Sequence, residues 1–111
     1  MSERRPIVVL VTAGSADDAG RIARALVEER LAACANIVSG VRSIYRWEGR
    51  LVDDTEWLLV VKTERTRFAA LEARVRALHT YTVPEVIALE IVEGSKPYLE
   101  WLLAASSEAG S

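Results

Sequence analysis

LAACANIVSGVRSIYRWEGRL, residues 31–51, is the stretch of sequence that decides the fold. Most of it is rich in β-branched and aromatic residues, which favours an extended strand. Ser39-Gly40 predicts a bulge or bend inside that strand, because glycine weakens a regular strand but permits unusual dihedral angles. Glu48-Gly49-Arg50 then supplies the glycine that a hairpin turn needs. The stretch therefore predicts a long strand and a hairpin, whose second strand is centred on residues 56–63.

The sequence before this hairpin predicts a strand and a helix. Residues 7–12, IVVLVT, form a continuous apolar, β-branched run that stops at Ala13-Gly14-Ser15, as a strand followed by a turn would. Ser15 lies three residues before Asp18 in a capping-box pattern. Apolar residues then repeat with helical spacing as far as Val27, which predicts the first helix.

The sequence after the hairpin predicts a second helix, a last strand and a C-terminal helix. Helical spacing returns from Thr66 to Leu78, residues 86–92 read as a strand, and Pro97 opens the final helix. The order β-α-β-β-α-β is that of a ferredoxin-like α+β sandwich, here followed by one more helix. We expect one domain over residues 1–111, with a core of about 6–104 and a flexible tail at 105–111.

Two predicted strands are apolar on both faces, over residues 7–11 and 57–61. A sheet with helices on one face only should alternate apolar and polar residues. Something must therefore cover the second face, and a further copy of the chain does so economically, which predicts a homo-oligomer. The alternative is that the C-terminal helix folds across the back of the sheet.

The charge and the cysteine content exclude several classes of function. The net charge of −2, with acidic and basic residues mixed along the chain, gives no field for nucleic acid and no polybasic segment for a membrane. Cys34 is the single cysteine, so no disulfide forms within the chain. The apolar run behind Arg4-Arg5 is too short for an export signal. A cytoplasmic location is the resulting prediction.

Cys34 and His79 are the first candidates for metal ligands, with carboxylates such as Glu85 beside them. In the predicted topology Cys34 and His79 lie at opposite ends of the sheet, separated by a strand of about 7 residues, roughly 23 Å. Only an arrangement between subunits would bring them to one ion; otherwise each would bind metal with other partners. The structural alternatives are a small buried apolar residue at Cys34 and a helix C-terminal residue at His79.

One edge of the predicted sheet collects several polar and aromatic side chains, and we expect a ligand there. Asp17 and Asp18, in the first turn of the first helix, would repel an anion, so a cation or a neutral polar ligand fits better. Packing or a subunit interface is the alternative for the two aromatic residues of the hairpin strand. The residues expected at this edge are Ser15, Tyr45, Trp47, Glu48, His79, Tyr81 and Glu85.

No arrangement of residues predicts catalysis or RNA binding. The strands at 7–11 and 57–61 are aliphatic apart from Trp57, whereas an RNA-recognition sheet needs exposed aromatic residues there. SGVRSIYR echoes the loop of acylphosphatases, but it lies inside a strand instead of between a strand and a helix. Since no nucleophile with a base is found either, we expect a protein that is not an enzyme.

Four segments together resemble the CutA family of divalent-cation tolerance proteins: VTAGSADDAGRIARALVEERLAACANI, IYRWEGRL, LLVVKT and HTYTVPE. The resemblance covers nearly the whole chain. It implies a ferredoxin-like protomer in a tight homotrimer, related in architecture to the PII signalling proteins. It also implies a link to divalent-metal tolerance, copper in particular, with Cys34 and His79 matching the family's proposed ligands.

Two positions depart from the family's pattern. Thr80 and Thr82 stand where the family usually has proline and glutamate. The missing proline should loosen the loop before the last strand, and the missing carboxylate removes one possible cation ligand. Two functions stay open. The protein is either a trimer that binds a metal ion in the clefts between its subunits, or a PII-like sensor or adaptor that takes a small ligand in those clefts.

Overall fold

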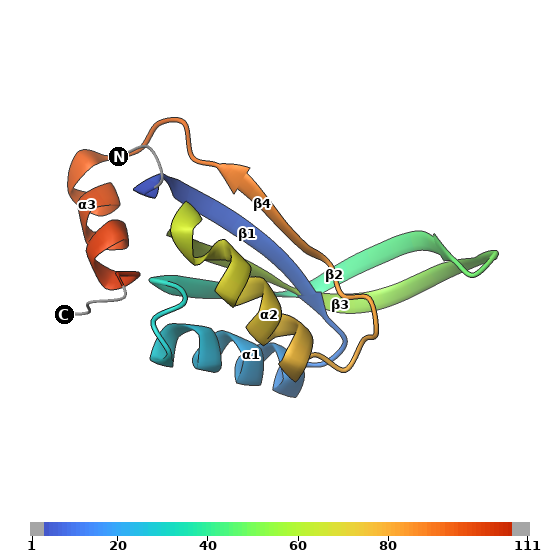
Figure 1. The fold of residues 1–111 in the computed structure, drawn as a ribbon. Coiled ribbons are helices and arrows are strands. Elements are labelled where there is room, and N and C mark those ends of the chain that lie inside the picture. Colours follow the sequence, from blue (N-terminus) through green and yellow to red (C-terminus); the bar gives the residue numbers. More distant parts are fainter. Residues whose placement is uncertain (1–3, 108–111) are drawn as a thin grey trace.

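The computed structural model describes residues 4–107 and has the predicted α+β architecture (Figure 1). One antiparallel sheet has the strand order β2-β3-β1-β4. Its strands are β1 (Pro6–Ala13), β2 (Cys34–Trp47), β3 (Arg50–Glu64) and β4 (Val86–Glu90). The helices are α1 (Ala16–Glu28), the short 3-10 helix η2 (Arg65–Arg67), α2 (Phe68–Leu78) and α3 (Lys96–Ala105). The predicted ferredoxin-like order of elements is confirmed.

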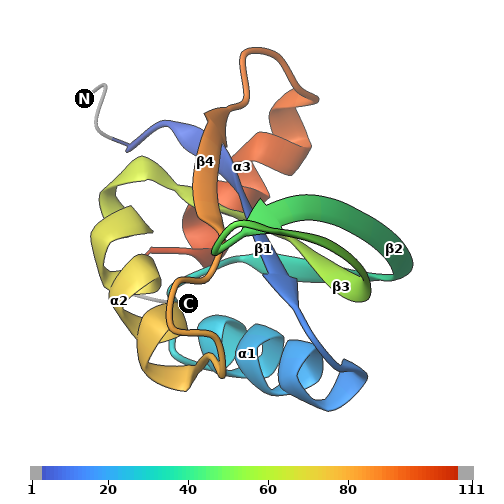
Figure 2. The same cartoon turned by 90° about the vertical axis from the view of Figure 1, so that its right-hand side faces the viewer.

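The core lies between the sheet and the two helices α1 and α2, which pack on the same face of it (Figure 2). Alternate residues of β1, from Ile7 to Ala13, point into this core and are buried. Ile22 and Leu26 of α1 and Leu71 of α2 meet them and are fully buried. The period of two in the strand and the spacing of the helical residues thus produce one continuous apolar layer.

The β2–β3 hairpin extends well beyond the rest of the sheet (Figure 1). Its turn has positive φ at both central residues, 51° at Glu48 and 78° at Gly49, as a tight hairpin turn requires. The register shifts between Val38 and Val41, and Gly40 within the shift has φ 73°. The bulge predicted at Ser39-Gly40 is confirmed, and it separates the sheet proper from the protruding arm.

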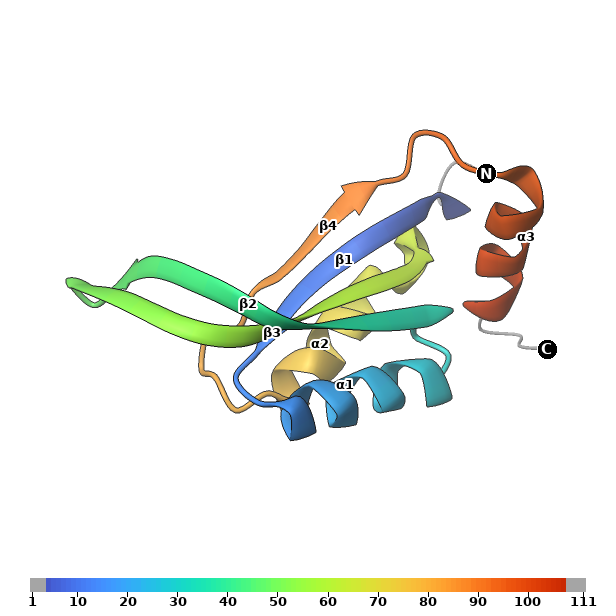
Figure 3. The same cartoon turned by 180° about the vertical axis from the view of Figure 1, so that it is seen from behind.

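Within residues 4–107, the second face of the sheet carries no helix across it. α3 lies at the end of the sheet where β1 begins, away from the hairpin tip (Figure 3), with Leu102 as its buried residue. Val38, Ile87 and Leu89 on the helix-free face remain about half exposed. The alternative in which the C-terminal helix covers the back of the sheet is therefore wrong.

The structure describes residues 105–107 of the predicted tail. Ala105 ends α3, and Ser106 is fully buried, with its hydroxyl donating to the carbonyl oxygen of Leu102 at 2.8 Å and to Glu64 at 3.4 Å. These contacts hold the end of α3 against the end of β3. Residues 108–111, the rest of the predicted tail, lie outside the described part of the chain. Within residues 4–107, no helix has the length and apolarity to cross a membrane.

Candidate functional site

Glu56 of β3 is an acidic residue of the sheet that is buried, only 5% exposed. It pairs with Val41 just beyond the bulge, so its side chain lies on the helix-free face, where the sheet joins the hairpin arm. The Tyr81 hydroxyl donates a hydrogen bond of 2.7 Å to Glu56 Oε2. Within residues 4–107 no lysine or arginine forms an ion pair with this carboxylate. A buried carboxylate without a cation is costly, which marks this position as special.

The loop between α2 and β4 brings Tyr81 to this carboxylate. His79 ends α2, and its Nε2 lies 2.7 Å from the carbonyl oxygen of Thr12. The Tyr81 backbone N–H donates to His79 Nδ1 at 3.0 Å, so Nδ1 is the acceptor and Nε2 carries the proton. Thr80 also donates to Asp18 of α1 at 3.4 Å. The loop is therefore tied by hydrogen bonds to β1, β3 and α1.

Gly14 allows Tyr81 to come this close. A Cβ atom added at Gly14 would lie 3.0 Å from the Tyr81 hydroxyl oxygen, tighter than ordinary contacts. Gly14, which directly follows β1, therefore leaves the space through which the Tyr81 phenol reaches Glu56. In contrast, a Cβ at Gly20 on α1 would meet nothing within 4 Å.

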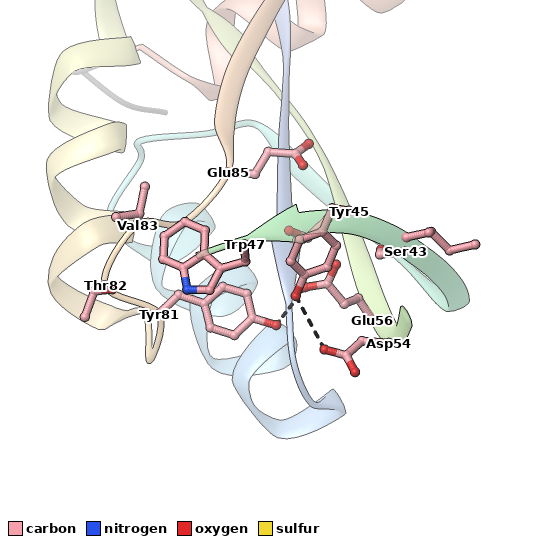
Figure 4. A pocket seen from close by; sticks show the side chains of 11 residues that line it. Ser43, Tyr45, Trp47, Asp54, Glu56, Tyr81, Thr82, Val83 and Glu85 are labelled. Carbon is pink, nitrogen blue, oxygen red and sulfur yellow. Dashed lines mark hydrogen bonds between the residues drawn. The ribbon is translucent and has the colours of Figure 1, made fainter. Parts of the chain in front are cut away.

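An open pocket of about 600 Å³ surrounds the Glu56–Tyr81 pair (Figure 4). Its walls come from the end of β1, both strands of the hairpin and the loop before β4. On the hairpin, Ser43 pairs with Asp54, and Tyr45 shares their face by the period of two. The lining residues are Thr12, Ser43, Ile44, Tyr45, Trp47, Asp54, Glu56, Tyr81, Thr82, Val83 and Glu85.

The electrostatics of the pocket are one-sided. Asp54, Glu56 and Glu85 line it, and among residues 4–107 no lysine, arginine or histidine does. Burial, followed by the nearby charge of Glu56, raises the pKa of Glu85 above its ordinary value. Burial and the hydrogen bond to Glu56 raise the pKa of Tyr81. Burial, together with the charge of Asp54, raises the pKa of Tyr45, whose hydroxyl lies 3.4 Å from Asp54 Oδ2. Both phenols stay protonated as donors, and the pocket favours positive charge.

The structure brings together part of the predicted ligand edge. Tyr45, Trp47, Tyr81 and Glu85 line the pocket. The other three candidates have local roles outside the lining. Ser15 caps α1 by accepting from the Asp18 N–H at 3.1 Å, Glu48 forms the hairpin turn, and His79 fixes the loop through both ring nitrogens.

Cys34 lies apart from this pocket. It begins β2 in register with Lys62 on the helix-free face, and its thiol lies 3.6 Å from Asn36 Oδ1. The interpretation of Cys34 as a buried apolar residue is wrong: the register turns it away from the helix-covered core and leaves it partly exposed.

The predicted metal ligands do not meet within one protomer. Among residues 4–107, no three His, Cys, Asp or Glu side chains are grouped so that they could hold a metal ion. His79 also has both nitrogens occupied by hydrogen bonds, so neither is available to an ion without breaking one. Cys34, His79 and Glu85 of a single chain therefore do not fit a shared metal.

Sequence reasoning missed Asp54 and Glu56, the acidic residues at the centre of the pocket. Their signal is an acidic pair with strand spacing directly before the apolar run 57–61, opposite Ser43 and Val41 of β2. The contribution of Thr12 and Val83 has no comparable signal, because it depends on how the loop before β4 crosses the sheet.

The fold and the pocket define a class: small α+β sandwich proteins with a projecting hairpin and a ligand-sized pocket at its base. The family model of the CutA1 divalent ion tolerance protein matches residues 7–105, and the chain belongs to that family. A divalent-cation tolerance protein CutA from Thermus thermophilus is 60% identical over 95 residues, covering 86% of this chain and 92% of the relative. The crystal structure of CutA1 from Oryza sativa superposes with a TM-score of 0.91 at 44% identity, covering 97% of this chain and 99% of that one. The family's description names tolerance and no reaction.

The relatives overturn the prediction of a cytoplasmic location. A relative from Arabidopsis thaliana is named chloroplastic; it is 49% identical over 86% of this chain, which spans 53% of that protein. A structure from Archaeoglobus fulgidus, described as periplasmic, has a TM-score of 0.88 at 37% identity, covering 92% of this chain and 99% of that one. Relatives of this domain are thus described as belonging to different compartments. The charge, composition and single cysteine of the domain do not specify a compartment.

Proposed function

We propose that this protein acts in divalent-ion tolerance as a homo-oligomeric, non-enzymatic binding protein whose pocket around Glu56 takes a positively charged ligand. The observation that carries the proposal is the Glu56 carboxylate, 5% exposed and without a basic partner in residues 4–107. A ligand cation would supply the missing charge. The family's description names tolerance and no reaction, which supports a binding role over turnover.

The homo-oligomer is supported by the helix-free face of the sheet. Val38, Ile87 and Leu89 are 44%, 51% and 51% exposed there, on neighbouring parts of one sheet. Exposed apolar side chains on adjacent strands favour burial against another copy of the chain. We propose a homotrimer, as the family resemblance implies. Because Glu56 lies on the same face, a second copy packed there would also form a wall near the pocket.

Copper or another divalent ion is the second candidate ligand. Its support is the partly exposed thiol of Cys34 on the same helix-free face, together with the family's description. In this proposal Cys34 of one subunit would complete a site with groups of a neighbour. The alternative is a role in which the projecting hairpin contacts a partner protein. Neither the positively charged ligand of the pocket nor the metal ion would affect that contact.

Calorimetric titration of the metal-free protein with copper and zinc, with light scattering for the oligomer, separates these proposals. Metal binding lost in a Cys34→Ser, His79→Ala double variant supports the inter-subunit metal site. Metal binding lost in Glu56→Gln, but kept in the double variant, supports the pocket. A monomer by light scattering, at concentrations where the protein is folded, would contradict the homo-oligomer.

A further inference from the structure

The size of the pocket and the spacing of its carboxylates argue against a bare metal ion as its ligand. A volume of about 600 Å³ is that of a small-molecule site. Divalent ions require several oxygen ligands converging to about 2–2.6 Å. The pocket's acidic residues do not form such a group. Its charge therefore suits a larger cation that needs no tight coordination shell.

The three carboxylates also exclude the common anionic metabolites. Asp54, Glu56 and Glu85 line the pocket without any basic side chain to receive a phosphate or carboxylate. An anion placed here would meet like charges in a partly desolvated site. The lining therefore favours cations over anions.

The aromatic lining favours one kind of cation. Tyr45, Trp47 and Tyr81 contribute to the walls, from the hairpin strand and from the loop facing it (Figure 4). Aromatic faces attract weakly hydrated cations, and quaternary ammonium groups are bound by such walls. The Tyr81 hydroxyl is held by Glu56, so this ring is fixed in orientation before any ligand arrives.

We infer that the pocket binds an organic ammonium ion of metabolite size, with Glu56 as the counter-ion and Tyr45, Trp47 and Tyr81 as the aromatic wall. The inference rests on the proposed cation-binding function and names the class of ligand. Glu56 is 5% exposed and is hydrogen-bonded to Tyr81, whereas Trp47 is 44% exposed. A ligand would place its positive head toward Glu56 and its remaining atoms toward the opening.

Choline and 3,3-dimethylbutan-1-ol provide the decisive pair of probes, because they have the same shape and differ in charge. Calorimetric titration of the intact protein should show saturable binding of choline, and binding of the neutral alcohol weaker by about tenfold or more. Glu56→Gln should weaken choline binding by about tenfold or more. Glu90→Gln, which changes an exposed glutamate paired with Arg5, serves as the matched control and should leave it unchanged.

Trp47→Leu provides a second test should Glu56→Gln fail to fold, since Trp47 belongs to the exposed arm and not to the core. It should weaken choline binding by about threefold or more with the oligomer intact by light scattering. Equal binding of choline and the alcohol would overturn the inference. Copper or zinc binding that depends on Glu56, without choline binding, would overturn the inference but support the proposed function. Binding of none of these cations would overturn both.

Discussion

Two buried glutamates on strand β3 have opposite surroundings. Glu64, at the end of β3, is 2% exposed and accepts two hydrogen bonds from Arg4, of 2.8 and 2.9 Å, and one of 2.8 Å from Thr66. Glu56 is 5% exposed and accepts one hydrogen bond, from Tyr81. Arg4 neutralises the first carboxylate, whereas within the described part of the chain no basic residue forms an ion pair with the second.

The difference separates a structural carboxylate from a binding one. Arg4 also donates to the carbonyl oxygen of Leu103 at 2.9 Å, so the Glu64 cluster connects the start of the chain, the end of β3 and α3. Glu56 connects β3 to the loop before β4, beside an open pocket. A charge compensated within the fold contributes to stability, whereas one left uncompensated beside a pocket is available to a ligand.

The largest expected effect of a single change is that of Glu64→Gln on stability. Removing the charge weakens the hydrogen bonds to the Arg4 guanidinium, and we expect the free energy of unfolding to fall by about 1.5–3 kcal/mol. Denaturant unfolding at a fixed protein concentration measures it. The exposed pair Arg5–Glu90 is the control, because Glu90→Gln should cost less than about 1 kcal/mol. An equal loss of unfolding free energy in the two variants would contradict a structural role for Glu64.

Tyr81→Phe should cost less than Glu64→Gln, about 1–2 kcal/mol. It deletes the donor to a buried carboxylate and leaves Glu56 without a hydrogen bond from a side chain. Tyr45→Phe is a matched control, since its hydroxyl lies 3.4 Å from the less buried Asp54. Thermal and denaturant unfolding of both variants would measure the difference. A smaller loss in Tyr81→Phe than in Tyr45→Phe would contradict the account.

Acid should lower the stability that the Glu64 cluster contributes to the fold. The hydrogen bond from Arg4 holds the pKa of Glu64 below its ordinary value, so the folded state binds that proton more weakly than the unfolded state. The stability from this group is complete above the ordinary carboxyl range, about pH 4, and is lost as the pH falls through the lowered value. Unfolding measured from pH 6 to pH 2 should show this loss in the wild type, and a smaller one in Glu64→Gln. An identical pH dependence in the two proteins would contradict this contribution of the Glu64 carboxylate to stability.

Glu56→Gln should have the smallest effect on stability. The glutamine can still accept from Tyr81, and the change removes a buried charge that has no cation near it. We expect the free energy of unfolding to stay within about 1 kcal/mol of the wild type or to rise. A loss as large as that of Glu64→Gln would show that Glu56 is structural as well.

The sequence predicts the fold far better than it predicts the site. Hydrophobic spacing and the Glu48-Gly49 turn are local signals, and they indicate the order of elements, the hairpin and the bulge at Gly40. The site depends on long-range placement: Tyr81 meets Glu56 because His79 bonds to Thr12, across 67 positions of the chain. No periodicity encodes that contact.

Individual residue types were also ambiguous in the sequence. Ser15 and His79 have the chemistry of ligands, yet hydrogen bonds to the backbone occupy both of them. Glu56 directly precedes the apolar run 57–61, so in the sequence it resembles any solvated acid at a strand end, whereas in the structure it lies within β3 and is buried. Burial, which decides its role, is a property of the folded chain alone.

Thermal unfolding with and without choline in the wild type, Glu56→Gln and Glu64→Gln tests the central claim most directly. A ligand that binds only the folded state raises its melting temperature by mass action. We expect choline to raise the melting temperature of the wild type and of Glu64→Gln by similar amounts and that of Glu56→Gln by clearly less. A shift of equal size in all three proteins, or its loss in Glu64→Gln alone, would contradict the assignment of one buried glutamate to binding and the other to stability.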